Sequence, residues 1–151
     1  MNKLKNIILK EGDELILNEG VKSFTVEDLA SKLSMSKSTI YQYFPTKEVL
    51  LKNIIIFKLK RMSKEFDNII KSEPNDPVAQ FIKVRDLHIK YSYAINFKRL
   101  HYLKTRYPDI WGIIEKYIIE RIETFKNIFI LAQEKGYLRE TIDPILSAKL
   151  L

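Results

Sequence analysis

Side chains that can read a base pair stand close together in the segment SKSTIYQYFPTK, residues 36–47. In the major groove of DNA, Lys binds guanine, Gln binds adenine, and Ser or Thr binds either base. Two tyrosines of the segment, Tyr41 and Tyr43, carry hydroxyls that can donate to phosphate oxygens at the edge of the groove. If the segment is a helix, the residues that we expect to face the groove are Lys37, Ser38, Thr39, Tyr41 and Gln42.

A first short helix is predicted directly before this segment. Thr25 lies three residues before Asp28, the spacing of a capping box, in which the hydroxyl accepts from the Asp28 N–H and the carboxylate reaches back. A helix should therefore begin at Val26. Its apolar residues recur at helical spacing and predict one buried face, made of Val26, Leu29, Ala30 and Leu33.

A second short helix should begin after Ser36, because serine is a favourable N-cap residue. This helix is expected to carry Ile40 inward and to leave its polar side free. Pro45 disfavours helical geometry at Phe44, so the helix should end there. Thr46 can then cap a third helix.

The charges of this region favour an anionic partner. Between Asp28 and Glu48 every charged residue is a lysine, namely Lys32, Lys37 and Lys47. We therefore expect a phosphate backbone to approach this surface without meeting a carboxylate.

These residues resemble the TetR-type family of transcriptional repressors. The similarity covers residues 7–51, about a third of the chain. It consists of an Ile-x-x-x-small pattern ending in Glu-Gly, then Thr-Val-x-Asp-Leu-Ala, then Ser-Lys-Ser-Thr-Ile-Tyr-x-Tyr-Phe-x-x-Lys-x-x-Leu. The last motif is the specific part. The resemblance implies a dimeric regulator that binds a palindromic operator and is released by a small molecule.

The resemblance also implies roles for single residues. Base or nearby phosphate contacts are implied for Lys37, Ser38, Thr39 and Tyr41, and backbone contacts for Thr25, Tyr43 and Lys47. The chain departs from the family at Ser34, where the family usually has Gly in the turn. A serine with a positive φ would be mildly strained there.

Length and composition limit the function classes. The chain has 151 residues, a net charge of +7 and no cysteine, which favours a polyanionic partner and excludes disulfides and thiolate metal sites. We find no apolar run long enough to span a bilayer and no signal peptide, and we expect a cytoplasmic protein. No cofactor is expected.

Periodicity predicts an all-α fold. The resemblance implies a DNA-binding domain at residues 1–46 and a ligand-binding and dimerisation domain at residues 47–151. In the first predicted helix, residues 2–19, the expected buried stripe is Leu4, Ile7, Ile8, Leu15 and Ile16. Gly12 of this helix should allow another helix to approach closely. Further helices are expected at residues 47–71, at 77–92 with Asn75 or Asp76 as its cap, at 95–104 and 108–135, and from Asp143. Because the sequence stops in the first of the family's two dimer helices, we expect a truncated chain.

The second domain holds aromatic and histidine residues that could line a ligand pocket. The candidates are Phe81, His88, Tyr91, His101, Tyr102, Trp111 and Tyr117, with Tyr93 and Phe97 as further aromatic residues. The alternative is that aromatic residues at helical spacing are ordinary core. His88 and His101 have no metal-ligand spacing.

Three other interpretations remain open. The two short helices could be surface helices with solvated lysines, although bulky exposed tyrosines have little structural purpose. An enzyme is disfavoured because the chain has no nucleophile elbow, phosphate-binding glycine loop or HExxH motif. A basic protein that binds nucleic acid or a membrane surface without sequence preference would be expected to have a more concentrated basic face.

Overall fold

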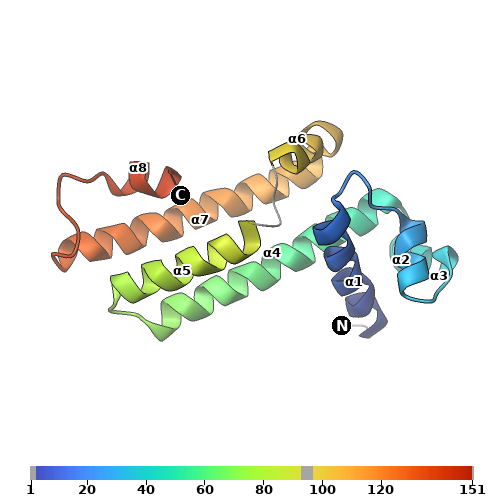
Figure 1. Ribbon diagram of the computed structural model, residues 1–151, viewed down its shortest axis with the longest axis horizontal. Helices are drawn as coiled ribbons and strands as arrows, with labels where there is room; N and C mark the ends of the chain where they lie inside the picture. The colour runs from blue at the N-terminus through green and yellow to red at the C-terminus, as the bar shows by residue number, and fades with distance from the viewer. Residues whose placement is uncertain (1–2, 93–96, 151) are drawn as a thin grey trace. The chain divides into compact units, whose positions relative to one another are not determined.

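The computed structural model describes residues 3–92 and 97–150, and within these ranges every regular element is a helix (Figure 1). The chain forms two compact units. Unit 1 comprises Met1–Arg61 and Ala94–Ile113, and unit 2 comprises Met62–Tyr93 and Ile114–Leu151. The predicted all-α fold class is confirmed.

Unit 1 is built on three helices and the start of a fourth. They are α1 (Lys3–Glu19), α2 (Val26–Lys32), α3 (Lys37–Tyr43) and the first part of α4 (Lys47–Ser72). Their shared core consists of side chains with almost no exposed surface, among them Ile8, Phe24, Leu29, Ile40, Phe44, Leu50, Leu51 and Ile54. Unit 1 also contains α6 (Phe97–Arg106) and the first turns of α7 (Pro108–Glu134).

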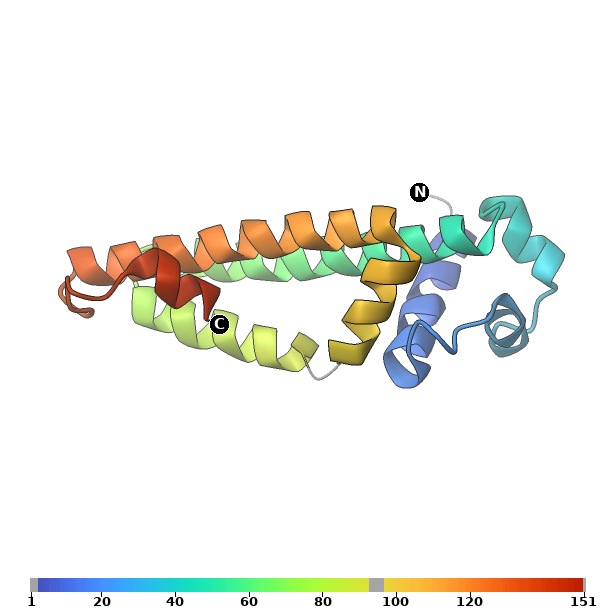
Figure 2. The same ribbon diagram turned by 90° about the horizontal axis from the view of Figure 1, so that it is seen from above.

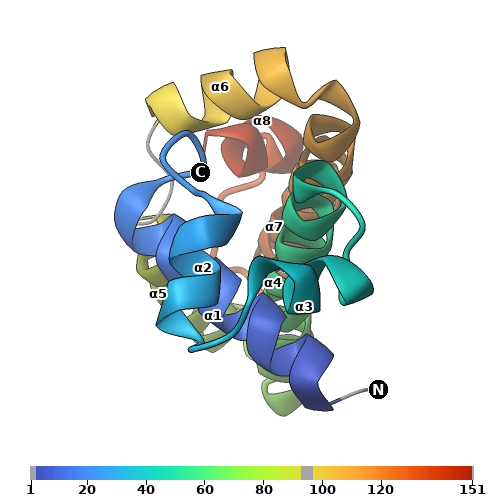
Figure 3. The same cartoon turned by 90° about the vertical axis from the view of Figure 1, so that its right-hand side faces the viewer.

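Local signals end the helices of unit 1 where the sequence predicts. Gly20 follows α1 with a φ of 87°, a left-handed conformation that glycine adopts without steric cost. Figure 3 shows the turn between α2 and α3. Ser34 of this turn has a φ of 52°, the positive value at which a serine is mildly strained. Phe44 leaves the helical region at φ −136° and ψ 94°, as expected for the residue before Pro45.

The buried face of α1 differs from the predicted stripe. Ile7 is 39% exposed, so the prediction that it is buried is wrong, whereas Leu9 is buried instead. The buried face also includes the carboxylate of Asp13, which is 4% exposed. Asp13 forms ion pairs with Lys58 at 3.1 Å and Arg61 at 3.3 Å, both on α4. The core face of α1 is therefore set by what α4 presents to it, which the spacing of apolar residues does not reveal.

Gly12 lies where α1 and α4 meet, as predicted. A Cβ atom at Gly12 would lie 2.5 Å from Ile54 Cδ1 and 3.0 Å from Ile54 Cγ1. Ile54 has no exposed surface and belongs to α4. The glycine thus permits a helix contact that any larger residue would obstruct.

Unit 2 consists of the end of α4, α5 (Pro77–Ser92), the larger part of α7, and α8 (Pro144–Lys149). In two views α5 runs back along α4 and α7 lies beside both (Figures 1 and 2). Asp76 caps α5 by accepting from the Ala79 N–H at 2.9 Å, and Asp143 caps α8, so both helices begin as predicted. The helix predicted at residues 95–104 ends two residues too early, since α6 (Phe97–Arg106) extends to Arg106, and its predicted start at residue 95 lies outside the described residues.

Candidate nucleic-acid interface

Helix α3 is held in place by its N-cap residue and by two buried side chains. Ser36 caps it, since its hydroxyl oxygen accepts from the Thr39 N–H at 3.1 Å. Ile40 and Phe44 are fully buried in the core of unit 1. With this side of α3 fixed inward, the remaining side chains of the helix face outward.

The outward side of α3 carries most of the residues predicted to face a groove. Lys37, Ser38, Gln42 and Tyr41 are exposed, Tyr41 by 38%. Thr39 is only half-exposed, and its hydroxyl lies 2.9 Å from the Ser36 hydroxyl. Four of the five predicted side chains are therefore exposed, while Thr39 takes part in the cap.

The residues predicted to hold a nucleic-acid backbone lie at the starts of α2 and α4 and at the end of α3. Thr25 accepts from the Asp28 N–H at 3.1 Å and donates its own hydroxyl proton to the Asp28 carboxylate. Lys47 is half-exposed and places its ammonium 5.9 Å from the centre of the Phe24 ring, within the range of a cation–π contact. Tyr43 is half-exposed. The starts of α2 and α4 thus place the Thr25 hydroxyl and the Lys47 ammonium at this surface.

The expectation of a surface without carboxylates is wrong. The Lys37 ammonium lies 2.5 Å from the Glu27 carboxylate, in the first turn of α2. The hydrogen bond between them lowers the pKa of Glu27 and raises the pKa of Lys37, so both groups are charged at neutral pH. Glu27 lies just outside the interval of the sequence that has no carboxylate, and the turn between α2 and α3 brings Lys37 back to it.

A second lysine of the predicted surface is also paired. The Lys32 ammonium lies 3.2 Å from the Glu11 carboxylate and 3.7 Å from that of Glu14, both on α1. Ion pairs as exposed as these contribute little to stability. The cationic character of the surface is therefore partly balanced within the protein itself.

The candidate ligand residues divide between the two units. Phe81, His88, Tyr91 and Tyr117 belong to unit 2, and His101, Tyr102 and Trp111 belong to unit 1. Tyr93 and the side chain of Phe97 lie outside the described residues.

In unit 2, three of these aromatic groups belong to packed clusters. The Phe81 ring lies 6.5 Å from Phe125 and 5.6 Å from Phe129, and the exposed His88 ring lies 6.4 Å from Phe125. The buried Tyr91 donates its hydroxyl to Glu65 at 2.6 Å. These contacts fit the core alternative for Phe81 and Tyr91.

In unit 1, two of the remaining candidates, Tyr102 and Trp111, contact residues nearby in the sequence. The Tyr102 ring lies 6.1 Å from that of Tyr107, and Lys104 lies 5.7 Å from the Trp111 ring centre. His101 is exposed.

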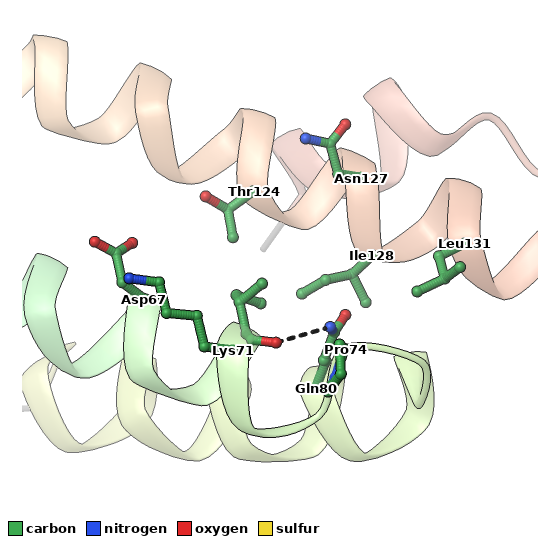
Figure 4. A pocket seen from close by; sticks show the side chains of 9 residues that line it. Asp67, Lys71, Pro74, Gln80, Thr124, Asn127, Ile128 and Leu131 are labelled. Carbon is green, nitrogen blue, oxygen red and sulfur yellow. Dashed lines mark hydrogen bonds between the residues drawn. The ribbon is translucent and has the colours of Figure 1, made fainter.

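Unit 2 contains an open pocket of about 440 Å³ (Figure 4). Asp67 and Lys71 of α4 line it, together with Thr124, Asn127 and Ile128 of α7. Gln80 also lines the pocket, and its side-chain amide donates to the Ile70 and Glu73 carbonyls. The pocket wall, as far as the structure describes it, contains none of the predicted ligand residues, and both long helices contribute polar side chains to it.

Two further structural findings concern the described residues alone. They contain no group of three or more His, Cys, Asp or Glu residues arranged to hold a metal ion. None of their helices combines the length and the apolar composition that a membrane crossing requires.

The residues that form this surface lie within a segment that is similar to a known protein family. Residues 8–54 match the family described as "Bacterial regulatory proteins, tetR family". Over 70 residues the chain is 37% identical to the HTH-type transcriptional regulator EthR of Mycolicibacterium smegmatis, a match that covers 46% of this chain and 32% of EthR. The N-terminal part of the chain is thus similar to TetR-family regulators. The resemblance found in the sequence is thereby confirmed.

Solved TetR-family structures share the fold. PfmR of Thermus thermophilus is 25% identical and superposes with a TM-score of 0.74 over 95% of this chain and 79% of PfmR. AibR, solved in complex with isovaleryl coenzyme A and operator DNA, is 18% identical, with a TM-score of 0.73 over 97% of this chain and 80% of AibR. The chain spans less than two thirds of the length of the curated relatives that it matches.

Sequence reasoning missed two charged residues of this chain. One is Glu27, whose partner Lys37 lies ten positions later. The other is Arg121, which stands among apolar residues on α7 and has two buried guanidinium nitrogens. A single arginine within an otherwise apolar helical stripe was the available signal for the second.

Proposed function

We propose that the chain is a sequence-specific DNA-binding regulator that represses transcription as a homodimer and leaves its palindromic operator when a small molecule binds. The observation that carries this proposal is the outward side of α3. Lys37, Ser38, Tyr41 and Gln42 are exposed on a helix whose opposite side is locked into the core by Ile40. Side chains of these types discriminate bases in the major groove.

The proposed roles follow the position of each side chain. Lys37, Ser38, Thr39, Tyr41 and Gln42 face the groove. Thr25, Tyr43 and Lys47 hold the sugar-phosphate backbone. On this proposal residues 1–46 are the DNA-binding domain, and residues 47–151 provide ligand binding and dimerisation. AibR, whose structure contains both operator DNA and isovaleryl coenzyme A, supports the general kind of partner.

Selection of bound DNA from a random pool tests the proposal. The expected product is a palindrome whose half-sites lie one helical turn or a multiple of it apart. Binding that depends strongly on salt but selects no sequence would instead identify a nonspecific nucleic-acid binder.

Lys47→Ala separates backbone contacts from base contacts. Because Lys47 is assigned to a phosphate, the variant should bind all sequences more weakly and reduce the salt slope by about 1. Fluorescence anisotropy on the selected operator and on single-base variants measures both effects. A loss confined to one base position would contradict the role assigned to Lys47.

A further inference from the structure

Arg121 is an unusual residue for the interior of unit 2. Its Nε and Nη1 atoms are buried and have no hydrogen-bond partner among residues 3–92 and 97–150. Leaving a buried charged donor unpaired is costly, so proteins normally pair such groups. The cost of this arrangement calls for a partner that residues 3–92 and 97–150 do not supply.

Aromatic rings hold the guanidinium of Arg121 in place. Its Cζ atom lies 5.1 Å from the centre of the Phe66 ring and 5.2 Å from the centre of the Tyr117 ring. Cation–π contacts of this length are favourable and orient the guanidinium while leaving the N–H groups at its edge free. The N–H donors of the Arg121 guanidinium are therefore held in one orientation before a ligand binds.

Tyr117 adds a second unpaired donor at the same place. Its hydroxyl is buried and has no hydrogen-bond partner in the described part of the chain. Burial raises the pKa of Tyr117 to about 12, so the phenol stays protonated at neutral pH and can donate. Two neighbouring side chains thus offer N–H and O–H donors that the described residues leave unused.

The open pocket of unit 2 begins on the same side of α7. Tyr117, Arg121, Thr124 and Ile128 recur at intervals of four, three and four residues and so share one helix face. Thr124 and Ile128 line the pocket of about 440 Å³. Asp67 also lines it, but it is exposed, and the ion pairs of the described residues include none between Asp67 and Arg121. A ligand that contacts Thr124 would lie about one helical turn from Arg121 and about two turns from Tyr117.

From this arrangement we infer that Arg121 and Tyr117 form an anion-binding anchor, and that the small-molecule effector of the proposed regulator is a monocarboxylate with an apolar body. An arginine fork matches the two oxygens of a carboxylate. One buried cation is neutralised by one negative charge, whereas a phosphate dianion would bring an uncompensated charge into the interior. The apolar body suits the surroundings, because Phe66, Phe125 and Val84 of unit 2 are buried. This inference rests on the proposed function for the effector role, but not for the binding itself.

Melting curves and calorimetry of the free 151-residue chain test the anchor. The probes are butyrate, hexanoate, octanoate and benzoate at millimolar concentration, each compared with its uncharged primary amide. Carboxylates should raise the melting temperature and the amides should not. Arg121→Met should weaken carboxylate binding at least about tenfold, and Tyr117→Phe should weaken it by less. The exposed Arg139→Met changes the charge equally and should leave binding unchanged.

The stability of the variants without ligand distinguishes an anchor from a structural role. Replacing an unpaired buried charge by a methionine should leave the melting temperature of the free protein unchanged or raise it. Asp67→Asn should likewise not lower the melting temperature of the free protein, because the ion pairs of the described residues include none between Asp67 and Arg121. The inference is overturned if no carboxylate probe binds, if binding survives Arg121→Met, or if Arg121→Met destabilises the free protein.

The two proposals fail separately. Carboxylate binding is measured without DNA, and operator binding is measured without carboxylate. Operator binding without any carboxylate effect would remove only the anchor. Carboxylate binding by a chain that selects no DNA sequence would remove the regulator and leave a ligand-binding protein.

Discussion

Glu27 restrains Lys37, which we propose contacts DNA, and Glu27→Gln should release it. In the free protein the Lys37 ammonium is held by the Glu27 carboxylate, and the side chains are 50% and 61% exposed. DNA must compete with this contact and bring its phosphates close to Glu27. The substitution therefore should increase the affinity for every DNA sequence while leaving the fold intact, because exposed ion pairs contribute little to stability.

The magnitude follows from counterion release. Each phosphate neutralised by a cation contributes about 0.9 to the salt slope. One further contact should therefore increase the loss of affinity between roughly 50 and 200 mM salt by a factor of about 3.5. Because this gain is the same for specific and nonspecific DNA, nonspecific binding should also rise. Glu27 would then favour specific binding, because it limits an attraction between Lys37 and phosphates that is the same for every DNA sequence.

Fluorescence anisotropy on the selected operator and on a scrambled duplex, across this salt range, provides the measurement. Glu140→Gln is the matched control, since Glu140 is exposed in unit 2 and its replacement makes the same change in net charge. The reasoning would be refuted by an unchanged salt slope in Glu27→Gln. If the effect of Glu27→Gln persists in a Lys37→Met background, it comes from repulsion of phosphates alone and not from the ion pair.

Three further predictions concern stability and can be measured by urea unfolding. Ser34→Gly should stabilise the protein by up to about 1 kcal/mol because it relieves a left-handed backbone, whereas Ser34→Ala should not. Gly12→Ala should destabilise it by about 1–2 kcal/mol, since the clash with Ile54 outweighs the gain in helix propensity, and adding Ile54→Val should restore part of the loss. Asp13→Ala should cost about 3 kcal/mol because it leaves Lys58, whose side chain is 12% exposed, without its counter-charge. The pair Asp13→Leu with Lys58→Met should recover most of this loss, and an additive double variant would contradict the assigned ion pair.

Much of the helical framework follows from interactions over a few residues. The caps at Thr25, Ser36, Asp76 and Asp143 each use a side chain and an N–H group two or three positions away. Gly20 ends α1 for an equally local reason. Such interactions depend on neighbours in sequence, so residue types at fixed spacing predict them. The position of α3 and its exposed polar side were predictable for the same reason.

The sequence by itself therefore determined the helices, their ends and the family-specific motif around α3. Only the tertiary structure decided which charges meet. Asp13 reaches Arg61 across 48 positions, Lys37 turns back to Glu27, and the Arg121 guanidinium lies against the Phe66 and Tyr117 rings. These contacts depend on how separate helices pack, and a charge has no helical period from which its partner can be inferred. A pattern of apolar residues shows which side of a helix is covered, but the covering helix decides whether a charge on it is paired, exposed or left without a partner.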